Sequence, residues 1–179
     1  ASQYFATMRP KAWVKVIEAR TAPTTEVVEG DLVLPLESGA TEAIGMRIVE
    51  VPDMPERARL NDSRASFTAY VPVGSLARGR NLVRTGGAVT TGGKTIEGRT
   101  TECSKCHGLD LHGMAAKPDG TPLAPTLLGR SPTYTFRQLY DIQRGTRKGT
   151  HITDMKNVVA QLTQMDMIDI AAYLASRMP

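Results

Sequence analysis

Glu102-Cys103-Ser104-Lys105-Cys106-His107-Gly108, written ECSKCHG, contains both cysteines of the 179-residue chain and one of its three histidines. A disulfide between Cys103 and Cys106 would close a loop too short to stabilise the fold appreciably, and two cysteines cannot form a disulfide framework. Because both thiols lie directly before a histidine, this segment indicates a specific chemical use rather than a structural crosslink.

The pattern C-x-x-C-H is typical of covalent haem attachment, in which the two thiols add to the two vinyl groups of the porphyrin. Its spacing places Cys103 and Cys106 on one side of a short helical turn and positions His107 as the proximal ligand of the iron. A thioredoxin-like redox pair usually opens a helix after a strand, which this flank lacks. A zinc site needs about four ligands, and the chain has no second cysteine pair. The segment therefore predicts one covalently bound haem c with its iron.

A second axial ligand is expected from the sequence after His107, unless the iron keeps an open position. The candidates by residue type are His112, Met114, His151, Met155, Met165, Met167 and Met178. Met155 lies between two predicted helices on the return path of the chain, where it can face the opposite side of the ring. His151 is its main competitor. The three methionines in or beside the last predicted helix are better explained as core residues.

Three helices are predicted after residue 74, over residues 76–84, from Ser131 to Arg144, and from about Gln164 to Arg177. Ser75 and Ser131 are expected to cap the first two helices. Thr163 and Asp166 form a capping-box pair before the third. Gly79 in the middle of the first helix costs roughly 1 kcal/mol relative to alanine, which indicates close approach of another backbone.

The first 75 residues favour strands. Runs rich in β-branched residues occur at residues 13–18, 31–36, 44–51 and 67–73, between clusters of proline, glycine and threonine. This part of the chain contains no histidine or cysteine, so no catalytic constellation is expected in it. Residues 85–100, which are rich in glycine and threonine, predict an exposed loop or hairpin.

Composition limits the classes of function. Apolar residues make up 41% and charged residues 22%, which predicts a packed core. No apolar run approaches the length of a membrane span, and no leader opens the chain, so any export signal is expected to be removed or not included. Residues 1–75 carry a formal charge of −2 and residues 76–179 carry +6. Because the cations are scattered, the charge indicates docking on an acidic protein partner or a solvated surface rather than nucleic-acid binding.

Several segments between Val73 and Pro179 resemble, in order and spacing, a class I c-type cytochrome. These segments are residues 74–79, 103–108, 125–130, 138–141, 144–145, Met155 and residues 169–174. The sequence is most similar to the C-terminal domain of bacterial two-domain dihaem cytochromes c. It departs from the family in residues 85–102, which intervene before the haem motif, and in having a single motif. The chain thus resembles a dihaem protein whose first haem domain is missing, through truncation in evolution or cleavage of a longer chain.

The resemblance implies a mainly α fold, with a monohaem helical domain over residues 74–179 wrapped round one haem. An irregular N-terminal extension with short strands and no haem motif, residues 1–73, precedes it. The resemblance also implies that Met155 is the distal iron ligand and that the carbonyl of Pro125 accepts a hydrogen bond from the His107 ring. It further implies that Gly79 lets the first helix cross the last one near Tyr173.

The expected function is that of a periplasmic one-electron carrier with His107 and Met155 as iron ligands, and not of an enzyme. By charge, Arg130 and Arg147 are candidate partners of the haem propionates. Partners would be redox proteins that donate and accept electrons. One alternative is a haem subunit of a larger oxidoreductase, held there by the N-terminal extension. Another is a haem sensor with a labile sixth ligand.

Overall fold

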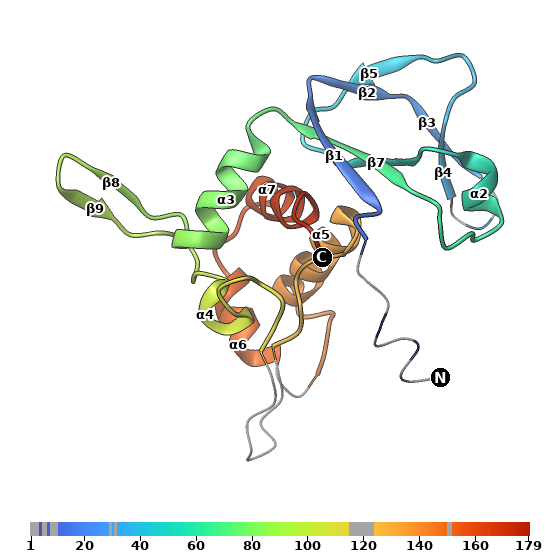
Figure 1. The fold of residues 1–179 in the computed structure, drawn as a ribbon. Coiled ribbons are helices and arrows are strands. Elements are labelled where there is room, and N and C mark those ends of the chain that lie inside the picture. The colour runs from blue at the N-terminus through green and yellow to red at the C-terminus, as the bar shows by residue number, and fades with distance from the viewer. Residues whose placement is uncertain are drawn as a thin grey trace.

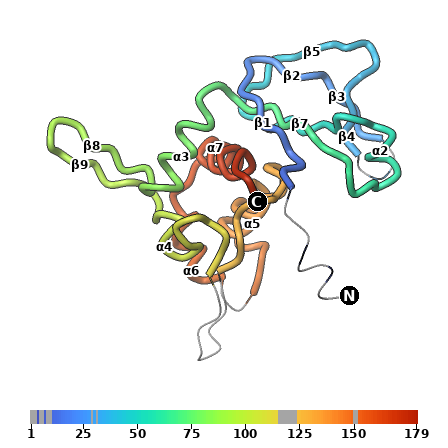
Figure 2. Tube along the Cα trace, in the orientation of Figure 1, coloured from blue at the N-terminus to red at the C-terminus, as the bar shows by residue number. Residues whose placement is uncertain are grey.

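The computed structural model describes residues 4, 7, 11–28, 30, 32–114, 124–149 and 152–179. Figure 1 shows two parts with different architecture: strands between residues 11 and 72, here called the strand region, and helices between residues 74 and 179, here called the helical region. Figure 2 follows the same path as a tube and shows β8 and β9 extending away from the remainder of the molecule.

The described residues of the strand region form one three-stranded sheet and two two-stranded sheets. In the first sheet β7 (Phe67–Pro72) lies between β1 (Val14–Ala19) and β6 (Val49–Pro52), parallel to β1 and antiparallel to β6. The other two sheets are antiparallel pairs of β2 (Thr21–Pro23) with β5 (Thr41–Ala43), and of β3 (Thr25–Val28) with β4 (Leu32–Pro35). A short helix, α2 (Pro55–Arg59), follows β6.

The predicted strands at residues 13–18, 31–36 and 67–73 are confirmed as β1, β4 and β7. The prediction of one strand over residues 44–51 was wrong, because only its end forms β6. Gly45 has φ +56°, and the Arg47 guanidinium donates to the carbonyl oxygens of Ala43 and Ile44. These contacts turn the chain between β5 and β6 instead of leaving it extended.

The helical region begins with α3 (Ser75–Thr85) and continues through α4 (Ser104–His107), α5 (Pro132–Arg144), α6 (Ile152–Val159) and α7 (Gln164–Ala175). Between α3 and α4, β8 (Val89–Thr91) and β9 (Lys94–Ile96) form an antiparallel hairpin whose residues are all exposed. The hairpin predicted for residues 85–100 is therefore confirmed.

Gly79 lies where α3 crosses α7. A Cβ placed on Gly79 would overlap the backbone carbonyl oxygen of Asp169 and would lie 2.8 Å from the Cβ of Tyr173. The expected close approach of the first and last helices is thus confirmed, and it explains why α3 accepts a residue that weakens a helix.

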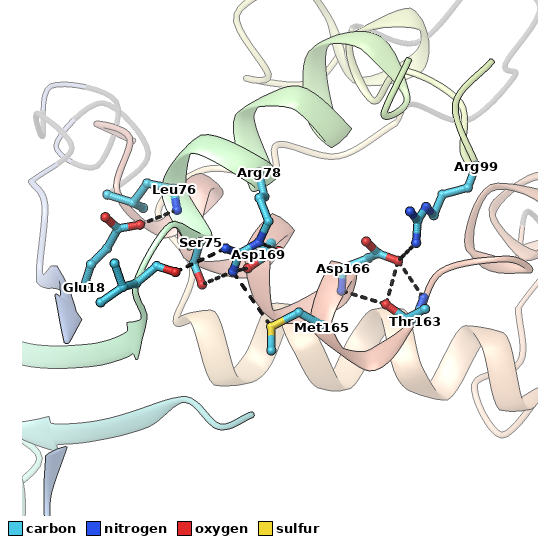
Figure 3. A network of polar contacts seen from close by, with 10 residues as sticks. Glu18, Ser75, Leu76, Arg78, Arg99, Thr163, Met165, Asp166 and Asp169 are labelled. Atoms are coloured by element: carbon cyan, nitrogen blue, oxygen red, sulfur yellow. Dashed lines mark hydrogen bonds and ion pairs between the residues drawn. The ribbon is translucent and has the colours of Figure 1, made fainter. Parts of the chain in front are cut away.

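An ion pair secures the same crossing (Figure 3). The Arg78 guanidinium donates to both carboxylate oxygens of Asp169, at 2.6 and 2.8 Å. Asp169 is 1% exposed, and a buried carboxylate left without its partner strongly destabilises a fold. Hydrogen bonding to Asp169 also raises the pKa of Arg78.

The helix caps follow the predictions with one exception. The Ser131 hydroxyl accepts from the amide of Tyr134, and Thr163 with Asp166 forms a complete capping box. Ser75 does not cap α3, because it is itself the first helical residue and Gly74, with φ +86°, occupies the N-cap position. The amide of Leu76 instead donates to a carboxylate oxygen of Glu18 at 2.7 Å, so a residue of β1 performs the capping role (Figure 3).

Candidate functional site

The haem motif forms α4, a single helical turn. The backbone amide of Cys103 donates to the carbonyl of Val83 at 3.0 Å, which ties the start of the turn to α3. His107 closes the turn through an amide hydrogen bond to the carbonyl of Cys103 at 2.9 Å. Gly108, with φ +82°, then turns the chain away. The His107 side chain is buried, whereas Cys106 is exposed and Cys103 is half-buried.

The orientation of the His107 ring is set by one hydrogen bond. Its Nδ1 lies 2.7 Å from the carbonyl oxygen of Pro125. Since a carbonyl oxygen can only accept, Nδ1 carries the proton, and in the neutral ring the lone pair is then on Nε2. A histidine that ligates a metal through Nε2 is commonly held in this way.

His107 and both cysteines line one cavity of about 540 Å³, which lies within the size range of cofactor pockets. Its walls are mostly apolar and include Leu139 and Ile142 of α5, Ile152 of α6, and Ile170 and Leu174 of α7. The cavity therefore lies between α4 and the three helices that follow it, α5, α6 and α7.

The Cys103 thiol belongs to the apolar part of this site. Burial raises its pKa to about 11, so the unmodified thiol is protonated at neutral pH. Catalytic thiolates lie instead in exposed, electropositive settings, which lower the pKa of the thiol. The environment of Cys103 therefore suits a covalent thioether better than a reactive thiolate.

Met155, on α6, lines the same cavity. The other described candidates for a second axial ligand lie elsewhere. His112 is exposed beside Asp110, with 3.4 Å between Nδ1 and Oδ2. The remaining methionines are Met114 and Met178, which are exposed, Met165, whose sulfur lies 4.0 Å from a nitrogen of Arg78, and Met167, which is fully buried in the core. His151 lies outside the described residues.

Exposed cations border the apolar cavity. Arg130 and Arg147 both line it, and Lys148 adds a third positive charge that the sequence reasoning missed. The Arg130 guanidinium lies 5.9 Å from the ring centroid of Tyr134, and Arg147 donates to the amide oxygen of Gln138. Glu102, the one carboxylate among the described residues of the lining, is paired with Lys105 at 3.4 Å.

Tyr134 and Gln138 of α5 also line the cavity and were not predicted. Their spacing of four residues, continued by Ile142, is the signal that was available, because residues at i, i+4 and i+8 share one helix face. Phe136 and Tyr140 of the same helix stack with ring centroids 6.0 Å apart and pack against the core, whereas Leu139 lines the cavity.

The residues present fit a haem. A haem combines an apolar ring with two carboxylates, and the cavity combines apolar walls with exposed cations. Two thiols and an available imidazole nitrogen meet at the wall formed by α4. The donor set does not suit a structural zinc site, which needs about four nitrogen or sulfur ligands, and the described residues contain no cluster of three or more His, Cys, Asp or Glu side chains arranged for a metal.

Comparisons with known proteins agree with this chemistry. The family model for cytochrome c matches residues 91–177. Cytochrome c-554(548) of Halomonas halodenitrificans is 35% identical over 81 residues, which cover 45% of this chain and 90% of the relative. Cytochrome c4 of Pseudomonas aeruginosa is 36% identical over 81 residues, which cover 45% of this chain and 36% of the relative.

The fold and the site define a c-type haem protein. The chain belongs to the cytochrome c family, and its resemblance to a class I c-type cytochrome is confirmed. Membership of this family implies a covalently bound haem c.

The match to the cytochromes c4 is partial. The chain spans about two fifths of the length of the cytochromes c4 that it matches, 40% for Azotobacter vinelandii and 36% for P. aeruginosa. A solved structure of Acidithiobacillus ferrooxidans cytochrome c4 shares 29% identity with a TM-score of 0.44, covering 58% of this chain and 50% of the other. No helix in the described ranges is long and apolar enough to cross a membrane.

Proposed function

We propose that the protein is a periplasmic one-electron carrier with a single haem c, attached through Cys103 and Cys106 and ligated by His107 and Met155. In this proposal residues 74–179 are the monohaem domain wrapped round the haem, and residues 1–73 are an extension without a haem. The observation that carries the proposal is that all four side chains line one apolar cavity, where His107 has its Nε2 free.

Each residue has a defined task in this proposal. The cysteines fix the ring covalently to α4. The Pro125 carbonyl holds the His107 ring in the tautomer that ligates through Nε2, and increases its basicity. Met155 would supply the second iron ligand, and a thioether ligand raises the reduction potential relative to a second histidine. The bound haem supplies one-electron oxidation and reduction. The apolar walls exclude water, and Arg130 and Arg147 pair with the propionates.

Docking on an acidic partner is proposed to use a groove between α3 and the end of α7. Arg80, Arg84 and Arg177 line this groove together with neutral residues. All three arginines are exposed, and Arg84 donates to the carbonyl of Leu109 at 2.8 Å. A partner docked there would therefore contact the loop that follows His107. Electron transfer to a partner with an acidic face should slow as salt is raised.

Replacing the arginines of the groove tests this part of the proposal. Arg80→Gln with Arg177→Gln should lower the association rate with an acidic redox protein and flatten its salt dependence, as followed by stopped-flow absorbance. Arg20→Gln with Arg64→Gln removes the same charge from the strand region and serves as the control. Equal salt dependence in both double variants would contradict docking at the groove.

The Met155→Ala variant tests the axial ligand. The oxidised wild type should show the weak far-red charge-transfer band of a methionine-ligated haem, and the variant should lose it. The reduced variant should bind carbon monoxide, whereas the reduced wild type should not. Met114→Ala is the control, since Met114 is exposed and does not line the cavity. Carbon monoxide binding by the wild type would instead favour the haem sensor with a labile sixth ligand.

A further inference from the structure

One wall of the cavity is contacted by the strand region. The segment from Gly129 to Tyr134 contributes the side chains of Arg130 and Tyr134 to the cavity lining. On its outer side this segment packs against the C-terminus, because a Cβ on Gly129 would lie 2.7 Å from the Cβ of Pro179. The position of Arg130 therefore depends on what holds its two neighbours, Gly129 and Ser131.

Glu50 of β6 holds the Ser131 side of this segment. The Ser131 hydroxyl donates to Oε2 of Glu50 at 2.6 Å, and the amide of Thr133 lies 3.4 Å from the same oxygen. Ser131 also caps α5 by accepting from the amide of Tyr134. A carboxylate at a helix N-terminus is favourable because it opposes the positive end of the helix dipole. Glu50 thus reinforces the cap from a different part of the chain.

Trp13 holds the Gly129 side. Its indole Nε1 donates to the carbonyl oxygen of Gly129 at 3.2 Å. The indole ring is itself fixed, because it packs edge-on against Phe67 of β7 with ring centroids 5.7 Å apart. Glu50 in the three-stranded sheet and Trp13, directly before its strand β1, therefore contact the residues on both sides of Arg130.

We propose that the strand region acts as a clamp on the haem cavity, in which Trp13 and Glu50 are positioning residues that hold Arg130 beside the bound haem and thereby set its reduction potential. This inference rests on the proposed function and assigns a role to residues 11–72. It gives the strand region an effect on the redox centre without a haem or a ligand of its own.

The sign of the effect follows from charge. Reduced iron carries one positive charge fewer than oxidised iron, so a cation held beside the ring favours the reduced form. Loosening the segment moves Arg130 away on average and lowers the midpoint potential. Trp13→Phe is the clean probe, because it removes the indole N–H and leaves an aromatic ring and all charges. A variant of Glu50 would mix the loss of its own negative charge with the displacement of Arg130.

The experiment is potentiometry of the holoproteins of the wild type, Trp13→Phe, Arg130→Gln and the double variant. Trp13→Phe should lower the midpoint potential. At a fixed applied potential, the ratio of reduced to oxidised protein should fall on the order of threefold. Arg130→Gln should lower it at least as much. In the double variant Trp13→Phe should add nothing, because the charge through which it acts is already absent.

Thr68→Val is the matched control. It removes a hydrogen bond of the same sheet, from the Thr68 hydroxyl to Asp53 at 2.7 Å, which does not reach the cavity wall. Its midpoint potential should equal that of the wild type. Haem content and far-UV circular dichroism show whether each variant is folded, and only folded holoproteins are compared.

Two results would overturn the clamp. One is a folded Trp13→Phe holoprotein with an unchanged midpoint potential. The other is a shift of the same size in the Arg130→Gln background, which would mean that Trp13 does not act through Arg130. Failure of the proposed function has a different signature: a wild type without covalent haem, or without a reversible one-electron couple.

Discussion

The helical region and the strand region bury their apolar side chains in different ways. Buried residues of the helical region form one large cluster, including Val83, Met167 and Leu174, that surrounds the cavity of about 540 Å³. The cluster in the strand region is small and consists of Ala22, Ile44, Val49 and Val51, with Tyr70 packed against it. The buried cluster of the helical region thus surrounds a cavity, whereas the buried residues of the strand region pack against one another.

The two regions are joined by hydrogen bonds at helix ends as well as by packing. Glu18 caps α3, Glu50 reinforces the cap of α5, and Trp13 contacts the loop before α5. The difference between the regions therefore predicts that substitutions at the cavity should destabilise the helices more than the sheets. Substitutions of exposed contacts in the strand region should change the free energy of unfolding little.

The largest effect is expected from replacing both haem cysteines. Cys103→Ser with Cys106→Ser should abolish covalent haem, and intact-mass spectrometry should find the bare polypeptide. Amide hydrogen exchange should then accelerate more in α5, α6 and α7 than in β1, β6 and β7, because an unfilled apolar cavity destabilises the helices around it.

Ser104→Ala, between the two cysteines, is the control and should retain full haem content. Equal acceleration of exchange in both regions would break the comparison, since it would show that the sheets depend on the filled cavity as much as the helices do.

The next effect is expected at the α3–α7 crossing. Arg78→Met leaves the buried carboxylate of Asp169 without its partner, which should lower the free energy of unfolding by about 3 kcal/mol. Urea denaturation of the holoprotein measures it. The matched control is Arg59→Met in the strand region, where the pair with Glu56 is exposed and should contribute no more than about 1 kcal/mol. Similar losses in the two variants would contradict the difference between the regions.

Gly79→Ala should have a somewhat smaller effect. The added methyl group meets the Asp169 carbonyl, and α3 must shift away from α7 at a cost of about 2 kcal/mol. Arg80→Ala, at the next and exposed position of the same helix, should change the free energy of unfolding by less than about 0.5 kcal/mol. A Gly79→Ala variant as stable as the wild type would show that the two helices are free to separate.

The parts that were predicted correctly from sequence have local signals. Three of these signals each consist of four or five consecutive residues: the haem motif, the Thr163–Asp166 capping box and the Ser131 cap. Such signals fix a helix end through contacts between near neighbours, so no knowledge of the remaining fold is needed. Gly79 belongs to the same group, because a glycine in a helix interior already indicates a close neighbour even when that neighbour is unknown.

The parts that were missed depend on residues distant in sequence. Ser75 has the residue type of a cap. The amide of Leu76, however, donates to the carboxylate of Glu18, which lies 58 positions earlier. The contact of Glu50 with Ser131 joins residues 81 positions apart. The polar residue Gln138 of α5 also lines the cavity, and apolar periodicity gives no signal for a polar lining residue.

The smallest effect is expected from pH in the strand region. Hydrogen bonds from Arg64, first from its guanidinium and then from its amide at 2.9 Å, lower the pKa of Asp62. A carboxyl group whose pKa is lowered by folding contributes stability above its unfolded pKa, and that contribution is lost as the pH falls through the lowered value. As the pH falls below about 4, the free energy of unfolding of the wild type should therefore decrease slightly more than that of the Asp62→Asn variant.

NMR titration of the Asp62 carboxyl group measures the lowered pKa directly, and urea midpoints at several acidic pH values measure its consequence. Because the pair is at the surface, added salt should weaken both effects. The Arg78–Asp169 pair, whose carboxylate is buried, should respond less to the same salt, since screening acts mainly on exposed charges. A salt response as large at Arg78 as at Asp62 would mean that water reaches the α3–α7 crossing, and that the helical region is more open than its buried cluster indicates.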